Sequence, residues 1–117
     1  MSDPEKNTLL YTCSGAANTG FLADSIARKM MKEGCGNMSC LAGPGANLPK
    51  FHESLKNMSQ KIIIDGCSPA CGKKIFENYG LKEYSHFVLT DFGVEKGKTE
   101  ITESVISGTA ARIKEKM

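Results

Sequence analysis

Four of the five cysteines in this 117-residue chain stand where a metal ion or a thiol reaction could use them. Cys67 and Cys71 are four positions apart in the stretch "IIIDGCSPACGKK", which begins with three consecutive isoleucines. Cys13 follows the run "TLLYT", and Cys40 closes the short segment "NMSC". Four thiolates complete the tetrahedral ligand set of zinc, with Zn–S distances of about 2.3 Å. Two neighbouring thiols could instead form and exchange a disulfide.

The fold has to bring these cysteines together, and the chain alternates β-like runs with helical patterns, which is typical of an α/β protein. The predicted strands cover residues 8–12, 37–41, 61–65 and 86–90. The predicted helices cover residues 21–33, a segment that starts near residue 49, 69–79 and 103–116. Right-handed crossovers favour a small, doubly wound, mostly parallel four-stranded sheet flanked by helices, in the order 2-1-3-4. We expect residues 1–7 to be a loose tail and residues 8–117 to form a single α/β domain.

Local signals predict where the helices begin and end. Asn18 or Thr19 is expected to cap the first helix through its side chain, and Ser68 the helix over 69–79. Gly80 stands where a left-handed residue ends that helix, and Leu81 is expected to fold back onto its last turn.

The carboxyl ends of parallel strands meet at one edge of a sheet, and open α/β sheets place their sites there. Cys13, Cys40, Cys67 and Cys71 all follow or close predicted strands, and neighbouring strands are about 4.8 Å apart. We therefore expect these four to bind one zinc ion. Cys35 precedes the second strand and should lie at the opposite edge, as a surface thiol outside the site.

Other polar residues are expected to have supporting roles. Asp65 and Asp91 close two predicted strands, where a carboxylate can accept backbone amides, orient a loop or support a metal ligand. His52 lies in a predicted helix and His86 at the far edge of the sheet, so we interpret both as non-ligands.

The loop "CSGAANTGF" joins a predicted strand to a predicted helix, which is a common arrangement for binding an anion. A phosphate-binding loop would need a lysine where Phe21 stands. A low-molecular-weight phosphatase or arsenate reductase would need an arginine six residues after Cys13, where this chain has Thr19. Oxyanion chemistry at Cys13 is therefore poorly supported.

Composition narrows the class of protein. The net charge is +2 and acidic and basic residues are interspersed, so no nucleic-acid partner is expected. No apolar stretch approaches the length of a membrane span, and the polar start "MSDPEKN" is unlike a signal peptide. We therefore expect a cytoplasmic protein without membrane contact, in which cysteines stay reduced and bind metal or react.

The segments "YTCSGAANTG", "MSCLAG", "DGCSPACGKK" and "TDFGVEKG", in this order, resemble the DGC-domain family of zinc-binding proteins. The family takes its name from an Asp-Gly-Cys motif, here Asp65, Gly66 and Cys67. The resemblance implies four metal-ligand positions, which fall on the four cysteines named above and leave out Cys35.

Two kinds of function follow from these observations. In the first, the protein binds zinc, and the site is structural or handles metal or another soft ion. In the second, it is a thiol enzyme for redox, sulfur-transfer or oxyanion chemistry, with Cys67 as the nucleophile and Cys71 or Cys13 as the resolving thiol. A four-cysteine iron–sulfur cluster is a further alternative. The protein partner and any substrate stay open.

Overall fold

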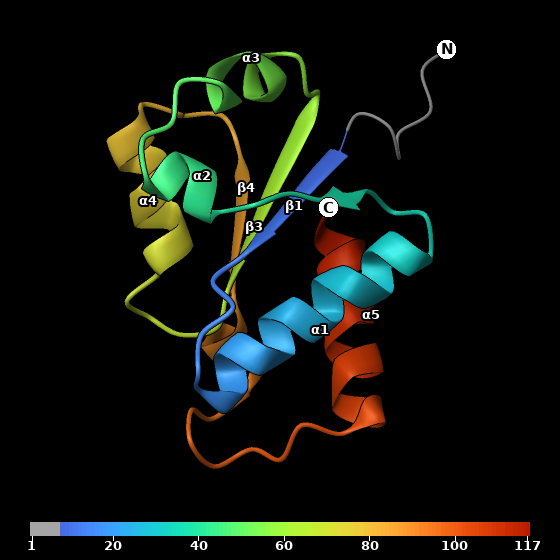
Figure 1. Cartoon of the computed structure of the whole chain (residues 1–117). Coiled ribbons are helices and arrows are strands. Elements are labelled where there is room, and N and C mark those ends of the chain that lie inside the picture. The colour runs from blue at the N-terminus through green and yellow to red at the C-terminus, as the bar shows by residue number, and fades with distance from the viewer. Residues whose placement is uncertain (1–7) are drawn as a thin grey trace.

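The computed structural model describes residues 8–117, apart from the side chains at positions 53, 54 and 56, and contains an all-parallel four-stranded sheet with helices on both faces (Figure 1). The strands are β1 (Thr8–Thr12), β2 (Asn37–Met38), β3 (Gln60–Asp65) and β4 (Ser85–Val88). The helices are α1 (Asn18–Lys32), α2 (Ala42–Gly45), α3 (Phe51–Lys56), α4 (Cys71–Tyr79), α5 (Glu103–Lys116) and the 3-10 helix η2 (Leu89–Phe92). The order β2-β1-β3-β4 confirms the predicted α/β topology, and the predicted tail at 1–7 lies outside the described residues.

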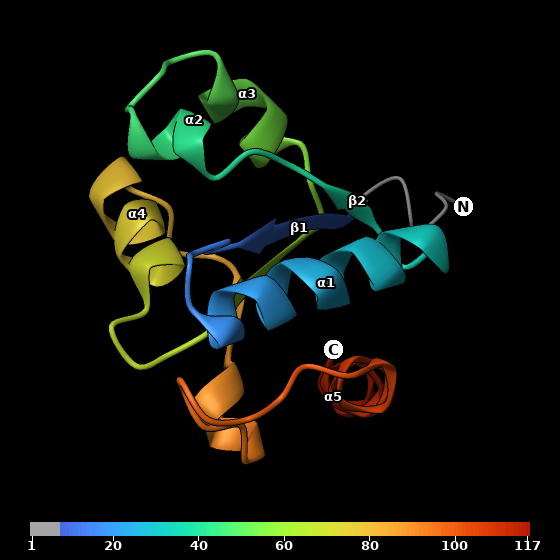
Figure 2. The same cartoon turned by 60° about the horizontal axis from the view of Figure 1, so that its bottom comes forward.

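The sheet separates two hydrophobic cores. Leu10, Ile62 and Ile64 point to the face that α1 and α5 cover, whereas Tyr11 and Ile63 point to the face that α3 and α4 cover. Figure 2 shows these two helical layers on opposite sides of the strands. Because β1 and β3 are covered on both faces, they read as continuous apolar runs rather than alternating ones.

Two strands are shorter than predicted. β2 ends at Met38. Beyond it, Ser39 donates its N–H to the Leu10 carbonyl (3.0 Å), and the chain then leaves the sheet and turns into α2. α2 lies in a segment for which the sequence analysis predicted neither a helix nor a strand. β4 ends at Val88, because Leu89 turns into η2 and buries its side chain in the α1 and α5 core.

The C-terminal end of α4 is as predicted. Gly80 has a φ of 87° and Leu81 donates its N–H to the Phe76 carbonyl at 3.0 Å. The left-handed glycine reverses the chain and satisfies the last carbonyls of the helix. Among residues 8–117, none of the helices has the length and apolar character that crossing a bilayer requires.

The predicted cap of α1 is wrong. The helix begins at Asn18, three residues earlier than expected, and Ala17 in the capping position offers no side-chain acceptor. The Asn18 side chain instead holds the loop between η2 and α5. Its Nδ2 donates to the carbonyls of Glu95 (3.1 Å) and Thr99 (2.9 Å), and its Oδ1 accepts the N–H of Gly97 (2.7 Å). The start of α1 is thereby tied to a loop about 80 residues further along the chain.

We expect Asn18→Ala to lower the free energy of unfolding by about 1–3 kcal/mol, because three hydrogen bonds of roughly 0.5–1.5 kcal/mol each are lost at a partly exposed site. Urea unfolding measures the change. Asn78→Ala is the matched control: Asn78 is exposed in α4, and alanine there should cost nothing. Equal shifts in the two variants would contradict the role given to Asn18.

Candidate cysteine site

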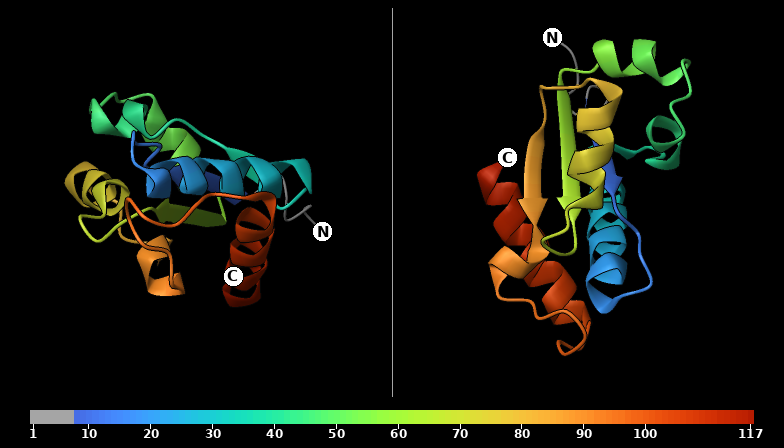
Figure 3. Two further views of the ribbon diagram at one scale, coloured as in Figure 1. Left: turned by 90° about the horizontal axis from the view of Figure 1, so that it is seen from below. Right: turned by 90° about the vertical axis from the view of Figure 1, so that its left-hand side faces the viewer.

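The loops that follow β1 and β3 meet at the carboxyl edge of the sheet. β1 and β3 are neighbours in parallel register, with Thr12 opposite Ile64, so both strands end at the same level (Figure 3). Cys13 comes directly after β1, and the N–H of Gly66 donates to its Sγ at 3.2 Å. The next residue, Cys67, is close enough for its charge to raise the pKa of Cys13. The structure therefore places Cys67 near Cys13 at this edge of the sheet.

The environment of Cys13 favours its protonated form. Burial is the main cause that raises the pKa of this thiol, and the nearby charges of Asp65 and Cys67 add to it. Backbone N–H groups of Gly66 and Gly15 act in the opposite direction by hydrogen bonding to the sulfur. A protonated thiol of this kind is a poor nucleophile by itself. It would react only when a metal cation or an oxidant favours loss of its proton.

Cys40 and Cys71 lie on the same edge but in a different setting. Cys71 is the first residue of α4, and Cys40 lies beyond the end of β2; both are exposed. The charge of Cys40 raises the pKa of Tyr11, after burial as the main cause, so Cys40 lies near Tyr11. Tyr11 belongs to the α3 and α4 core, whereas Cys13 packs against the α1 and α5 core. Cys13 and Cys40 thus approach the edge from opposite faces of the sheet.

All five cysteines are free thiols. Within the part of the chain that the structure describes, no three histidine, cysteine, aspartate or glutamate side chains converge in a way that could hold a metal ion. The four-cysteine zinc site therefore stays a prediction. Cys35 precedes β2, at the other edge, as expected. It is not the surface thiol of the prediction, because its side chain is half-buried against the α1 and α5 core.

Backbone strain flanks two of the cysteines. Ser14, directly after Cys13, has a φ of 43°, and Ala70, directly before Cys71, has a φ of 52°. Left-handed conformations in residues other than glycine cost about 1–2 kcal/mol each and persist where the surroundings impose them. Such strain is concentrated at functional sites, and here two of three such residues in the described chain adjoin candidate ligands.

The predicted cap of α4 is wrong as well. Ser68 is exposed, and the helix begins at Cys71 instead of 69. Asp65, the last residue of β3, takes the capping role: its carboxylate accepts the N–H groups of Gly72 (2.8 Å) and Lys73 (3.1 Å). Asp65 thus accepts backbone amides, as predicted, although these amides belong to the first turn of α4 and not to a loop.

A contact that the sequence analysis missed joins the same carboxylate to β4. The Nε2 of His86 lies 2.7 Å from Oδ2 of Asp65. The two residues are 21 positions apart, and only the pairing of β3 with β4 reveals that they meet. The one signal in the sequence for this contact is a polar residue, His86, on the strand predicted to lie next to the strand that ends at Asp65.

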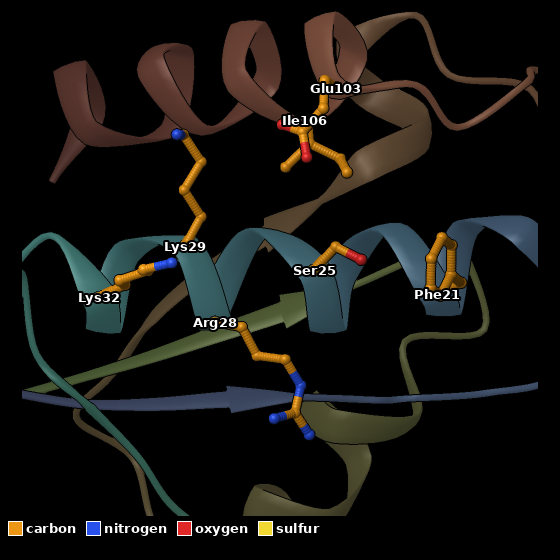
Figure 4. Close-up of a pocket in the computed structure, with 7 residues that line it drawn as sticks. All are labelled: Phe21, Ser25, Arg28, Lys29, Lys32, Glu103 and Ile106. Carbon is orange, nitrogen blue, oxygen red and sulfur yellow. The ribbon is translucent and has the colours of Figure 1, made fainter.

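Two hollows lie near α1. One, of about 470 Å³, lies between α1 and α5; Phe21, Ile106 and basic residues of α1 line it, and no cysteine does (Figure 4). Arg28 pairs with Asp24 at 2.6 Å and Lys29 with Glu33 at 3.2 Å, so much of its positive charge is neutralised.

The second hollow, of about 250 Å³, lies along the loop after Cys13. The side chains that line it belong to Phe21, Ser14 and Asp24, together with two glycines, and none is basic. This hollow therefore offers no cation for an oxyanion, in agreement with the missing arginine and lysine noted in the sequence.

The fold and the paired loops define a class: a small parallel α/β protein whose carboxyl edge carries thiols. The family model of the DGC domain matches residues 9–113, so the chain belongs to the DGC-domain family. The "Anaerobic and virulence modulator AnvM" of Pseudomonas aeruginosa is 28% identical to this chain over 96 residues, which cover 82% of this chain and 73% of that protein. No solved structure matches the chain.

Gly66 lies so close to α1 that a larger residue does not fit. A Cβ atom there would be 2.6 Å from the backbone carbon of Thr19 and 2.9 Å from the nitrogen of Gly20. We expect Gly66→Ala to lower the free energy of unfolding by about 1–3 kcal/mol in urea unfolding, because backbone has to move. In native protein it should also speed alkylation of Cys13, whose sulfur accepts the Gly66 amide.

Gly108→Ala in α5 is the control of opposite sign. Nothing lies within 4 Å of the added methyl group, and alanine is favoured over glycine in a helix by about 0.8–1 kcal/mol. The explanation of Gly66 by close packing would be wrong if both substitutions stabilised the protein.

Proposed function

We propose that this protein binds one zinc ion through Cys13, Cys40, Cys67 and Cys71, at the carboxyl edge of its sheet, in a site that is structural or handles metal. The observation that carries the proposal is the Gly66 N–H that donates to the Cys13 sulfur beside Cys67. Zinc with four thiolates carries a charge of about −2, and amide donors aimed at sulfur are the groups that stabilise it.

The other two thiols suit this proposal by their freedom to move. Cys40 and Cys71 are exposed, so their side chains can turn toward Cys13 and Cys67 without disrupting a packed core. Cys71 also occupies the first turn of α4, where the positive end of the helix dipole favours a thiolate. Lys73 and Lys74 are exposed in the same turn and add positive charge.

Protein purified anaerobically under reducing conditions should contain one zinc per chain by elemental analysis, with one free thiol, that of Cys35. Zinc binding should be weakened at least tenfold by each of the substitutions Cys13→Ser, Cys40→Ser, Cys67→Ser and Cys71→Ser, since loss of even an outer partner of a ligand costs about 10–100-fold in affinity. Competition with a chromophoric chelator measures the affinity.

Cys35→Ser is the matched control and should bind zinc as the unmodified protein does. Zinc removal should lower the melting temperature, because the binding energy of a metal site contributes to folding energy. Metal-free protein with five titratable thiols after anaerobic purification would rule out the zinc proposal. Bound iron and visible colour in the purified protein would show that the site holds an iron–sulfur cluster instead of zinc.

A second candidate function, a redox dithiol, is favoured by the closeness of Cys13 and Cys67. In this reaction Cys67 attacks and Cys13 resolves; the two thiols lose two protons and two electrons to an oxidant and form one S–S bond. The word "anaerobic" in the description of the P. aeruginosa relative agrees with a thiol site that responds to oxidants. Five free cysteines also suit a reducing compartment, and we propose a cytoplasmic location for the protein.

Treatment of metal-free protein with diamide should then produce a Cys13–Cys67 disulfide that dithiothreitol reverses, identified by mass spectrometry of unreduced peptides. Cys67→Ser should abolish it, and Cys35→Ser should leave its yield unchanged. A Cys67–Cys71 bond in its place would assign the resolving role to Cys71. If neither disulfide forms, the redox function is excluded.

A further inference from the structure

The Asp65 carboxylate is a buried acceptor for three donors from two different elements. Its residue is 1% exposed. Oδ1 accepts the Gly72 N–H at 2.8 Å, and Oδ2 accepts the Lys73 N–H at 3.1 Å and lies 2.7 Å from Nε2 of His86. A carboxylate can only accept, so Nε2 of His86 carries the hydrogen. Burying a carboxylate is unfavourable unless such donors surround it.

Two of these bonds fix the place where α4 begins. The first amides of a helix have no partner within the helix, and Ala70 in the capping position supplies no side-chain acceptor. Asp65 fills this role from the end of β3, across a distance of seven to eight residues. Because Cys71 is the first residue of α4, the same bonds hold Cys71 at a set position relative to β3 and Cys67.

The approach of α4 to Asp65 is close. A Cβ atom on Gly72 would lie 2.9 Å from Oδ1 of Asp65 and 2.7 Å from a methyl carbon of Ile63, so the first turn rests directly on β3.

His86 supplies the only side-chain donor among the three contacts described for this carboxylate. It stands on β4, where it is registered beside Ile63, and its side chain is 17% exposed. A donor that projects from the neighbouring strand fixes the rotation of the carboxylate, because two backbone amides from one helix turn leave the carboxylate free to swing with that turn. The pairing of β3 with β4 thus affects the first turn of α4, because it positions the imidazole that orients the Asp65 carboxylate.

We propose that Asp65 and His86 are positioning residues of the cysteine site: His86 orients the Asp65 carboxylate, and the carboxylate sets the first turn of α4 and with it Cys71. This inference rests on the proposed function for what Cys71 binds, but the positioning itself is a property of the metal-free protein. Neither residue touches the ligand in this proposal.

Amide hydrogen exchange by NMR, on reduced and metal-free protein, tests the positioning directly. In His86→Leu, the Gly72 and Lys73 amides should exchange at least about tenfold faster relative to the Leu81 amide, which bonds Phe76 at the other end of α4. In His86→Gln they should stay near the wild-type ratio, because the glutamine Nε2 can donate to the same oxygen.

His52→Leu is the matched control, since His52 stacks on Tyr79 at the far end of the same helix, with ring centroids 4.1 Å apart. It should leave the Gly72 and Lys73 ratios unchanged. Equal acceleration of all α4 amides in His86→Leu would overturn the proposal, because it would mean a general loss of stability. Unchanged exchange at Gly72 and Lys73 would overturn it as well.

Zinc competition on the same variants links the pair to the site. His86→Leu should bind zinc about 10–100-fold more weakly, and His86→Gln should restore most of the affinity. Unchanged affinity in His86→Leu would overturn the link between His86 and Cys71. If the wild-type protein binds no zinc, the proposed function fails, and the exchange ratios still decide whether His86 positions the helix.

Discussion

The site depends on one constraint, the parallel register of β1 and β3. Because Thr12 stands opposite Ile64, both strands end at the same level and their loops leave the sheet side by side. A slip of one residue would turn every side chain of a strand to the other face and would move Gly66 away from the Cys13 sulfur. The two cores, with Leu10 and Tyr11 on opposite faces of β1, make such a slip costly. Hydrophobic burial far from the cysteines thus determines which sulfur meets which amide.

The same sheet explains why the cysteines share an edge without forming a closed cage. Cys13 packs toward the α1 and α5 core, whereas Cys40 lies near Tyr11 of the other core. The loops meet at one edge of the sheet, but the side chains of Cys13 and Cys40 approach that edge from opposite faces. Bringing Cys40 and Cys71 to Cys13 would require rotation of their exposed side chains, whereas Cys13 packs against the α1 and α5 core.

The sequence predicted those features that periodicity and glycine punctuation determine. Strand order, α5 and the left-handed end of α4 at Gly80 followed from apolar runs and stop signals. The starts of α1 and α4 did not, since local rules favoured Asn18 and Ser68 as caps, whereas long-range contacts gave Asn18 a loop to hold and gave α4 the carboxylate of Asp65. The contact of His86 with that carboxylate depends on strand pairing, which spacing along the chain does not encode. Whether the four sulfurs share an ion is likewise a matter of side-chain rotation, beyond the reach of spacing.

The Asp-Gly-Cys motif combines three different physical roles in consecutive residues. Asp65, the last residue of β3, is buried and accepts the first amides of α4, a role that needs a carboxylate. Gly66 passes so close to Thr19 that a Cβ does not fit, and its amide donates to the Cys13 sulfur. Cys67 follows, half-buried, in the loop between β3 and α4. The residues cannot exchange places, because each role depends on the distance from the end of the strand. The motif is thus a junction that ties two loops and a helix to one strand end, and this holds whether the thiols there bind a metal or each other.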